Sequence, residues 1–264
     1  MSVININMLL ERKAELTEAF TIARPFGWVK ISNFLHDSAL HQIQNEFPKV
    51  TSDWINASGL NTKRKWTQPA VAGSVAAQFY EDVNSPEFLE LLSAITGIPR
   101  LLPDPDLFGA GYHQTFDGGY LNVHIDFNYH NKLHLDRRLN LIVYLNREWA
   151  PTWGGALELW DTTNKKMIAE VPPTENTAVL FATNDISYHG HPKPWNSGGR
   201  SARQSLSTYY YSNGRDDGAD ARPHSTRYVN TEGATGLFKA ISNGVTDVLR
   251  GGPIRRRLNL KGRR

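Results

Sequence analysis

Apolar side chains in the first hundred residues recur mainly at the spacing of an α-helix. Leu9, Leu16 and Phe20 form an apolar stripe that predicts a helix over 7–21. Ser85 before Pro86 has the form of a helix start, which predicts a further helix over 85–96. The remaining segments of this part are predicted as a strand over 28–35, a helix capped by Asp37 or Ser38 and ending at 47, and a loop with short pieces over 51–80.

The pattern changes between 107 and 212, where short apolar or alternating runs are separated by glycine, proline and asparagine. These runs are predicted to be strands over 107–116, 119–127, 138–145, 155–161, 166–171, 176–182, 186–190 and 204–212. Strands of this length and spacing are typical of a sandwich, a jelly roll or a barrel. We therefore expect a β core with the N-terminal helices packed on one side.

The end of the chain combines a predicted amphipathic helix over 235–249 with a basic tail over 250–264. The tail has seven lysines and arginines and no acid, and the formal net charge of the chain is +3, so residues 1–249 carry +3 − 7 = −4. Such a cluster can bind nucleic acid, anionic lipid or an acidic partner, or it can be a solvated terminus. The predicted organisation is one domain over 1–249 followed by this tail.

Composition excludes several classes of protein. The 264 residues have no cysteine, which excludes disulfides and zinc–thiolate sites and suits a cytoplasmic protein. No apolar run approaches the ~20 residues of a membrane helix, and the first residues lack the pattern of a signal peptide.

One chemical motif lies in the second predicted strand, at His124-Ile125-Asp126. Residues two apart on a strand point to the same face, so the imidazole and the carboxylate should lie side by side. They would supply two of the three ligands of a 2-His-1-carboxylate site for non-haem Fe(II). His189 can supply the third, because strands distant in sequence are often neighbours in a jelly roll.

A strand after this histidine begins with Arg203 and places Ser205 on the same face. A guanidinium with a nearby hydroxyl suits a carboxylate ligand, since it offers two parallel charge-assisted hydrogen bonds.

In order and broadly in spacing, His124-x-Asp126, His189 and Arg203-x-Ser205 resemble the 2-oxoglutarate/Fe(II)-dependent dioxygenases. The intervening segments 139–149 and 154–160, and the ending at Tyr209-Tyr210-Tyr211, resemble the prolyl 4-hydroxylase-like branch. The fold implied is a double-stranded β-helix (jelly roll, cupin-like) core with flanking helices, in the mainly β or α+β class. The resemblance covers roughly 107–212.

The resemblance also implies roles for single residues. His124, Asp126 and His189 would bind Fe(II), and Arg203 would pair with the distal carboxylate of 2-oxoglutarate. Further contacts to this co-substrate are expected from Tyr144 and Ser205. The family often lines the cofactor site with the strand before the first ligand, so Tyr112 is a further candidate, although which of Tyr112, His113 and Gln114 points inward stays open.

The implied reaction hydroxylates an unactivated C–H bond of a prolyl residue, an amino acid or another small molecule, and converts 2-oxoglutarate and O2 to succinate and CO2. Ascorbate is a further expected reductant. The carboxylate of Asp126 favours hydroxylation over halogenation, since related halogenases have a small residue at this position.

Several assignments stay open at this point. Arg200 competes with Arg203 as the anchor, because the fourteen positions from His189 to Arg203 exceed the usual spacing. Tyr210 or its neighbours could reach the pocket. Arg137-Arg138 could face the substrate, but the pair is interpreted as a solvated loop pair.

Two other functions compete with the dioxygenase: a non-enzymatic jelly-roll protein that binds metal or carbohydrate, and a zinc hydrolase. The arginine after the last histidine favours the dioxygenase, because neither alternative needs it. Substrate specificity is expected to depend on loops over 51–80, 128–137 and 191–202, and the motifs define neither the substrate nor the oligomeric state.

Overall fold

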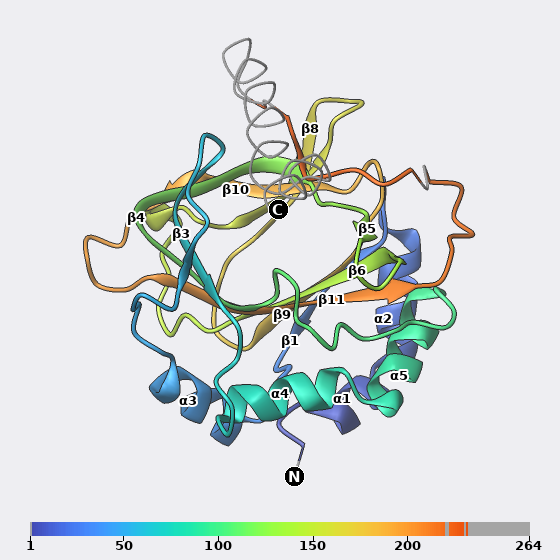
Figure 1. Cartoon of the computed structure of the whole chain (residues 1–264), viewed down its shortest axis with the longest axis horizontal. Helices are drawn as coiled ribbons and strands as arrows, with labels where there is room; N and C mark the ends of the chain where they lie inside the picture. Colours follow the sequence, from blue (N-terminus) through green and yellow to red (C-terminus); the bar gives the residue numbers. More distant parts are fainter. Residues whose placement is uncertain (1, 220–221, 230, 232–264) are drawn as a thin grey trace, which may run out of the picture.

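The computed structural model describes residues 2–219, 222–229 and 231, and the predicted helix over 235–249 and the basic tail lie outside them (Figure 1). The described part is mostly β, with a nearly closed antiparallel sheet and a group of helices against one face. No helix among these residues is long and apolar enough to span a membrane.

The α-helices among the described residues all lie in the N-terminal part. Their bounds are α1 Ile6–Glu11, α2 Lys13–Ile22, α3 Asp37–Glu46, α4 Val75–Val83 and α5 Pro86–Thr96, and a short 3-10 helix, η1, covers Pro151–Trp153. The single helix predicted over 7–21 is divided at Arg12. The prediction for α5 is confirmed, with Ser85 Oγ accepting a hydrogen bond from the backbone N–H of Phe88 and Gly97 ending the helix in a left-handed conformation.

Two predictions in this part are wrong. His36 occupies the N-cap position of α3, but its side chain makes no capping hydrogen bond. Asp37 lies in the first turn of the helix. The segment 51–80 is more regular than a loop, because it contains two strands and the first part of α4. Ser74 caps α4 by accepting from the N–H of Ala77, and this serine is the local signal for the helix.

The strands form one continuous set. Their bounds are β1 Trp28–Ser32, β2 Ile55–Asn56, β3 Thr62–Gln68, β4 Gly111–Ile125, β5 Tyr129–His130, β6 Leu135–Tyr144, β7 Leu157–Asp161, β8 Lys166–Val171, β9 Thr177–Ala182, β10 Tyr188–Trp195, β11 Arg203–Ser212 and β12 Arg227–Tyr228. Neighbouring strands follow the order β1-β9-β6-β11-β4-β10-β7-β8, and β3 and β12 also pair with β4. In Figure 1 the helices lie below β1, β9 and β11, while β4, β10 and β8 lie above, so the two halves of the sheet face each other. The expected jelly-roll core is confirmed.

β4 connects the two halves. Two strands were predicted here, separated at Gly118-Gly119, but the structure has one strand that pairs with β11 over its first part and with β10 over its second. A Cβ at Gly119 would lie 2.4 Å from Thr115 Cγ2 and 2.8 Å from the carbonyl oxygen of Lys63, so this close passage requires glycine.

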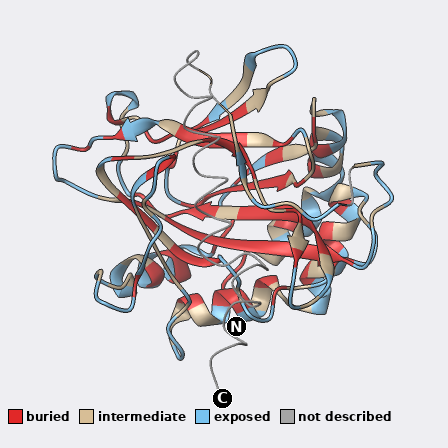
Figure 2. Ribbon diagram, turned by 45° about the horizontal axis from the view of Figure 1, so that its top comes forward, coloured by how far each residue is buried: buried red, intermediate tan, exposed pale blue. Residues whose placement is uncertain are grey.

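The strands of the sheet are mostly buried (Figure 2), and alternation along them separates the side chains of the hydrophobic core from those inside the barrel. On β6, Leu139, Leu141 and Val143 pack against the helices, and their neighbours Asn140 and Ile142 face the other way, into a cavity inside the barrel. β11 alternates in the same manner. The period of two therefore lets one strand supply both packing and polar groups.

Candidate active site

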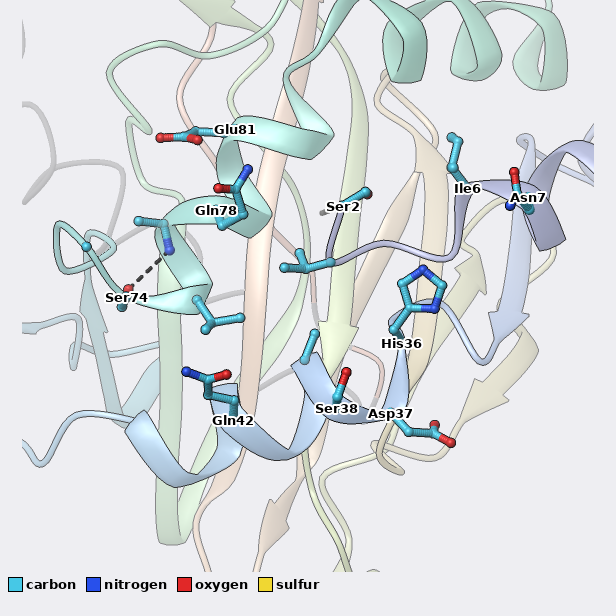
Figure 3. Close-up of a pocket in the computed structure, with 15 residues that line it drawn as sticks. Ser2, Ile6, Asn7, His36, Asp37, Ser38, Gln42, Ser74, Gln78 and Glu81 are labelled. Atoms are coloured by element: carbon cyan, nitrogen blue, oxygen red, sulfur yellow. Dashed lines mark hydrogen bonds between the residues drawn. The ribbon is translucent and has the colours of Figure 1, made fainter.

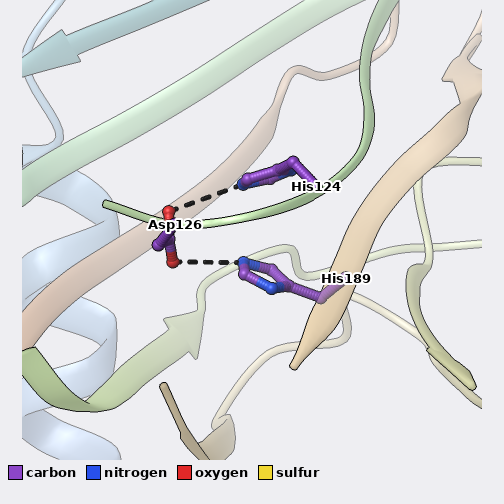
Figure 4. A group of neighbouring side chains, drawn as sticks. All are labelled: His124, Asp126 and His189. Atoms are coloured by element: carbon purple, nitrogen blue, oxygen red, sulfur yellow. Dashed lines mark ion pairs between the residues drawn. The ribbon is translucent and has the colours of Figure 1, made fainter. Parts of the chain in front are cut away.

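The structure brings His124, Asp126 and His189 together inside the barrel (Figure 4). His124 Nε2 lies 3.5 Å from one carboxylate oxygen of Asp126, and His189 Nε2 lies 3.4 Å from the other. The arrangement follows from pairing, since His189 on β10 is directly opposite His124 on β4. Their three ligand atoms are within 4.8 Å of one another, so a single metal ion could contact all three.

Both imidazoles have a fixed orientation. The Nδ1–H of His124 donates to the carbonyl of Asn122, and the Nδ1–H of His189 donates to the carbonyl of Ser187, each at 2.9 Å. These bonds place a proton on each Nδ1 and point both Nε2 atoms at Asp126, so Nε2 is the atom that each ring offers to a metal. Burial lowers the pKa of His124, and this favours the neutral form.

Asp126 is held as an anion by β6. Arg137 Nη2 and Asn140 Nδ2 donate to the same carboxylate oxygen at 3.0 and 2.7 Å. Burial alone would raise the pKa of this carboxyl, but the guanidinium and the imidazoles outweigh burial and hold the pKa well below its usual value. The carboxylate is therefore charged and fixed before any metal binds.

The interpretation of Arg137-Arg138 as a solvated loop pair is wrong. Both side chains are buried, at 1% and 3% exposure. The Arg137 guanidinium lies between the rings of Phe127 and Tyr209, 4.4 and 3.5 Å from their centroids. A cation can be buried here because the two rings and Asp126 replace its water.

Arg203 is the first residue of β11, and its side chain lines the same cavity as the triad. Its Nε donates to the carbonyl of Gly155 at 2.6 Å and its Nη2 to the hydroxyl of Tyr144 at 3.0 Å, which fixes the guanidinium with its remaining N–H groups available. Ser205 lines the same cavity. Arg200 is exposed and packs over the ring of Trp153, outside this cavity. The structure thus places Arg203, and not Arg200, beside the triad.

Tyr112 is not brought to the site. It is buried in the hydrophobic core and its ring packs against Phe47 and Trp54. The next residue, His113, lines the cavity instead, because adjacent residues of β4 face opposite sides. Similarly, Tyr209 faces the cavity, whereas Tyr210 points to the helices and donates to the carbonyl of Val83.

His191 and Lys65 also line the cavity. His191 is buried, and neither of its ring nitrogens has a hydrogen-bond partner among the described residues. Lys65 enters from β3. The alternation from His189 could have indicated His191, but Lys65 lies in the segment predicted as a loop.

A larger cavity of about 960 Å³ lies elsewhere, between the chain start and helices α3 and α4 (Figure 3). None of its lining residues belongs to the triad, and it contains no group of three metal-ligating side chains among the described residues. The chemistry of the described part is therefore concentrated inside the barrel.

The sequence between 110 and 211 matches the family model of the 2OG-Fe(II) oxygenase superfamily. This match covers most of the β core, from β4 to β11. The chain is a 2-oxoglutarate-dependent dioxygenase, and its cofactors are Fe(II), 2-oxoglutarate and O2. The matched residues include all three members of the triad and Arg203.

Solved structures of low sequence identity share the fold of this oxygenase. A prolyl-4-hydroxylase from Pseudomonas putida is 17% identical, with a TM-score of 0.52 over 74% of this chain and 98% of that chain. A prolyl hydroxylase from Trichoplax adhaerens, solved in complex with a hypoxia inducible factor oxygen degradation domain peptide, is also 17% identical, with a TM-score of 0.56 over 77% and 92%. The non-haem alpha-ketoglutarate dependent epimerase SnoN from nogalamycin biosynthesis is 15% identical, with a TM-score of 0.54 over 84% and 88%.

The side chains of the oxygenase fit its cofactors. Two imidazoles and a carboxylate are the donor set that non-haem Fe(II) uses. The N–H of the buried His191 ring and the available N–H groups of Arg203 have no described partner on the cavity side, and an acceptor-rich ligand would satisfy them.

Proposed function

We propose that this oxygenase hydroxylates an unactivated C–H bond, with His124, Asp126 and His189 as the iron ligands and Arg203 as the anchor of 2-oxoglutarate. The observation that carries the proposal is the buried guanidinium of Arg203, which shares one cavity with the triad. A zinc hydrolase or a binding protein needs no such cation next to its metal. A keto acid with two carboxylates needs a positive charge at each end, which the metal and Arg203 would supply.

Each residue has a definite task in this proposal. The imidazoles would bind the metal through Nε2, and the backbone carbonyls of Asn122 and Ser187 hold them in place. Asp126 would contribute the negative charge, with Arg137 and Asn140 fixing its carboxylate. Fe(II) bound here, together with 2-oxoglutarate and O2, would supply the oxidising power for C–H hydroxylation.

The co-substrate would extend from the triad toward Arg203. The guanidinium would bind its distal carboxylate, with the hydroxyls of Tyr144 and Ser205 at the same end of the cavity. Because Gly155 and Tyr144 already restrain Arg203, little side-chain freedom is lost on binding. The substrate of the proposed reaction is a peptide or a small molecule.

Turnover of 2-oxoglutarate tests the proposal directly. Purified protein with Fe(II) and O2 is expected to convert 2-oxoglutarate to succinate, slowly alone and faster with a substrate from a panel of peptides and amino acids. With ¹⁸O2, the substrate is expected to gain one labelled oxygen atom.

The matched control is His41→Ala, which removes an exposed histidine from α3 and should leave turnover unchanged. Asp126→Ala should abolish it. Succinate formation that survives in the Asp126 variant would refute the ligand assignment. A product without labelled oxygen, as an epimerase would give, would refute hydroxylation.

A further inference from the structure

Lys65 is a cation that lines the cavity and has no role in the proposed function. It is partly buried on β3 and lines the cavity with them. Its neighbour on the same strand, Lys63, is exposed. Residues two apart would normally share a face, but a register shift between them, with Arg64 at a φ of 50°, turns Lys65 inward.

The register of three strands brings Lys65 to the same row as Arg203. Thr115 on β4 is directly opposite Lys65 on one side and directly opposite Arg203 on the other. Directly opposite residues share a face of the sheet, so both long cationic side chains enter the barrel from one row. Adjacent strands are ~4.8 Å apart, which puts the two backbones ~10 Å apart across Thr115. A small anion could lie between the two charged groups.

The charges around this row are not balanced. The described residues that line the cavity include three strong cations and one carboxylate, and that carboxylate, Asp126, already accepts from Arg137 and Asn140. No described residue forms a hydrogen bond or ion pair with the Lys65 ammonium. Lys65 and Arg203 therefore face the cavity without an anionic partner.

Burial and the nearby positive charge act on Lys65 in the same direction. Burial first, and then the Arg203 guanidinium, lower the pKa of Lys65 to about 8. Five titratable or charged groups interact electrostatically with Lys65. They are His113 on β4, Asp126 just after β4, Arg137 on β6, His191 on β10 and Arg203 on β11. All except Asp126 are cationic or become cationic on protonation, so a bound anion would relieve the repulsion.

We infer that Lys65 is a second cationic contact for the distal carboxylate of 2-oxoglutarate, which it binds together with Arg203. The inference rests on the proposed function, because it assumes that Arg203 anchors this co-substrate. It assigns a ligand-binding role to β3, a strand that precedes the part of the chain matched by the family model. It also explains why a lysine without an acidic partner is directed into the interior.

The test compares two ligands in two lysine variants. 2-Oxopentanoate has the keto-acid end of 2-oxoglutarate but no C5 carboxylate. Both ligands are titrated anaerobically into the Fe(II)-loaded protein, and the dissociation constants are measured by calorimetry. Lys65→Met removes the proposed contact, and Lys63→Met is the matched control with the same change of charge on the same strand.

Lys65→Met is expected to weaken binding of 2-oxoglutarate about tenfold to a hundredfold, the range of a hydrogen bond to a charged group. It should leave the affinity for 2-oxopentanoate within about twofold, which also shows that the site is folded. Lys65→Arg should retain most of the affinity, and Lys63→Met should bind both ligands like the natural protein.

Two results would overturn the inference: unchanged binding of 2-oxoglutarate by Lys65→Met, or equal losses for both ligands. Arg203→Ala separates this failure from failure of the proposed function. If Arg203→Ala discriminates between the ligands and Lys65→Met does not, only the role of Lys65 is wrong. If neither variant discriminates, the anchor assignment is wrong as well.

Discussion

Replacement of Arg203 by alanine should have a large and specific effect on 2-oxoglutarate. The guanidinium is 6% exposed, and two of its five N–H groups donate to Gly155 and Tyr144, so three remain for a ligand. A carboxylate bound here leaves water completely, and this is favourable only if a charged partner replaces the water.

The size of the effect follows from this burial. Removing one partner of a buried charge pair typically costs ~3–5 kcal/mol, because the other charge stays buried and unpaired. At ~1.4 kcal/mol per tenfold change, the dissociation constant for 2-oxoglutarate should rise on the order of a hundredfold to a few thousandfold. Arg200→Ala should change it only a few-fold, since Arg200 is exposed and an exposed charge contributes ~0–1 kcal/mol.

The assay is anaerobic titration of 2-oxoglutarate into each Fe(II)-loaded variant. Fe(II) binding, measured separately, should be largely retained in both, because neither arginine belongs to the triad. If Arg200→Ala lost more affinity than Arg203→Ala, the anchor would have to move to the loop before β11, and the argument from burial would be refuted.

Four further outcomes are expected. Binding of 2-oxoglutarate should weaken as pH rises through about 8, because the ligand favours the charged form of Lys65, which is complete below this pKa; calorimetry of Lys65→Met should show a weaker dependence. Arg137→Met should lower the free energy of unfolding of the metal-free protein by ~3–5 kcal/mol in urea denaturation, because it leaves Asp126 buried without its cation; a loss below ~1 kcal/mol would contradict this. Gly111→Ala should cost at least ~1 kcal/mol in the same measurement, because its φ is +112° and the new Cβ would lie 2.2 Å from a backbone oxygen. Deletion of 251–264 should leave 2-oxoglutarate turnover within a few-fold, and a hundredfold loss would show that the tail contributes to the active protein.

The iron site was the most predictable part of the chain. The H-x-D spacing depends only on the alternation of an extended chain, which holds at His124 and Asp126 even though β4 ends at Ile125. His189 could be selected because it follows an apolar strand in the expected order. Arg203 could be preferred to Arg200 because a strand, unlike a Gly-Gly loop, can bury a guanidinium.

Other site residues depend on features that a sequence does not display. Tyr112 and His113 differ by one position, and the face of each is set by pairing with β3 and β11. Lys65 faces inward because of a bulge in a strand of largely polar residues, which has no apolar pattern to reveal it. Arg137 is buried because its partners come from the adjoining segment after β4 and from β11. In each case tertiary packing decides which face is inside.

The most direct test of the account is the visible spectrum of the protein with Fe(II) and 2-oxoglutarate in the absence of O2. A weak charge-transfer band should develop when the keto acid is added. Its intensity should reach a maximum at one iron per chain. The band should be absent from His124→Ala, Asp126→Ala and His189→Ala and present in His41→Ala. A band that persists in all three triad variants, or one that never forms in the natural protein, would contradict the assignment of this site.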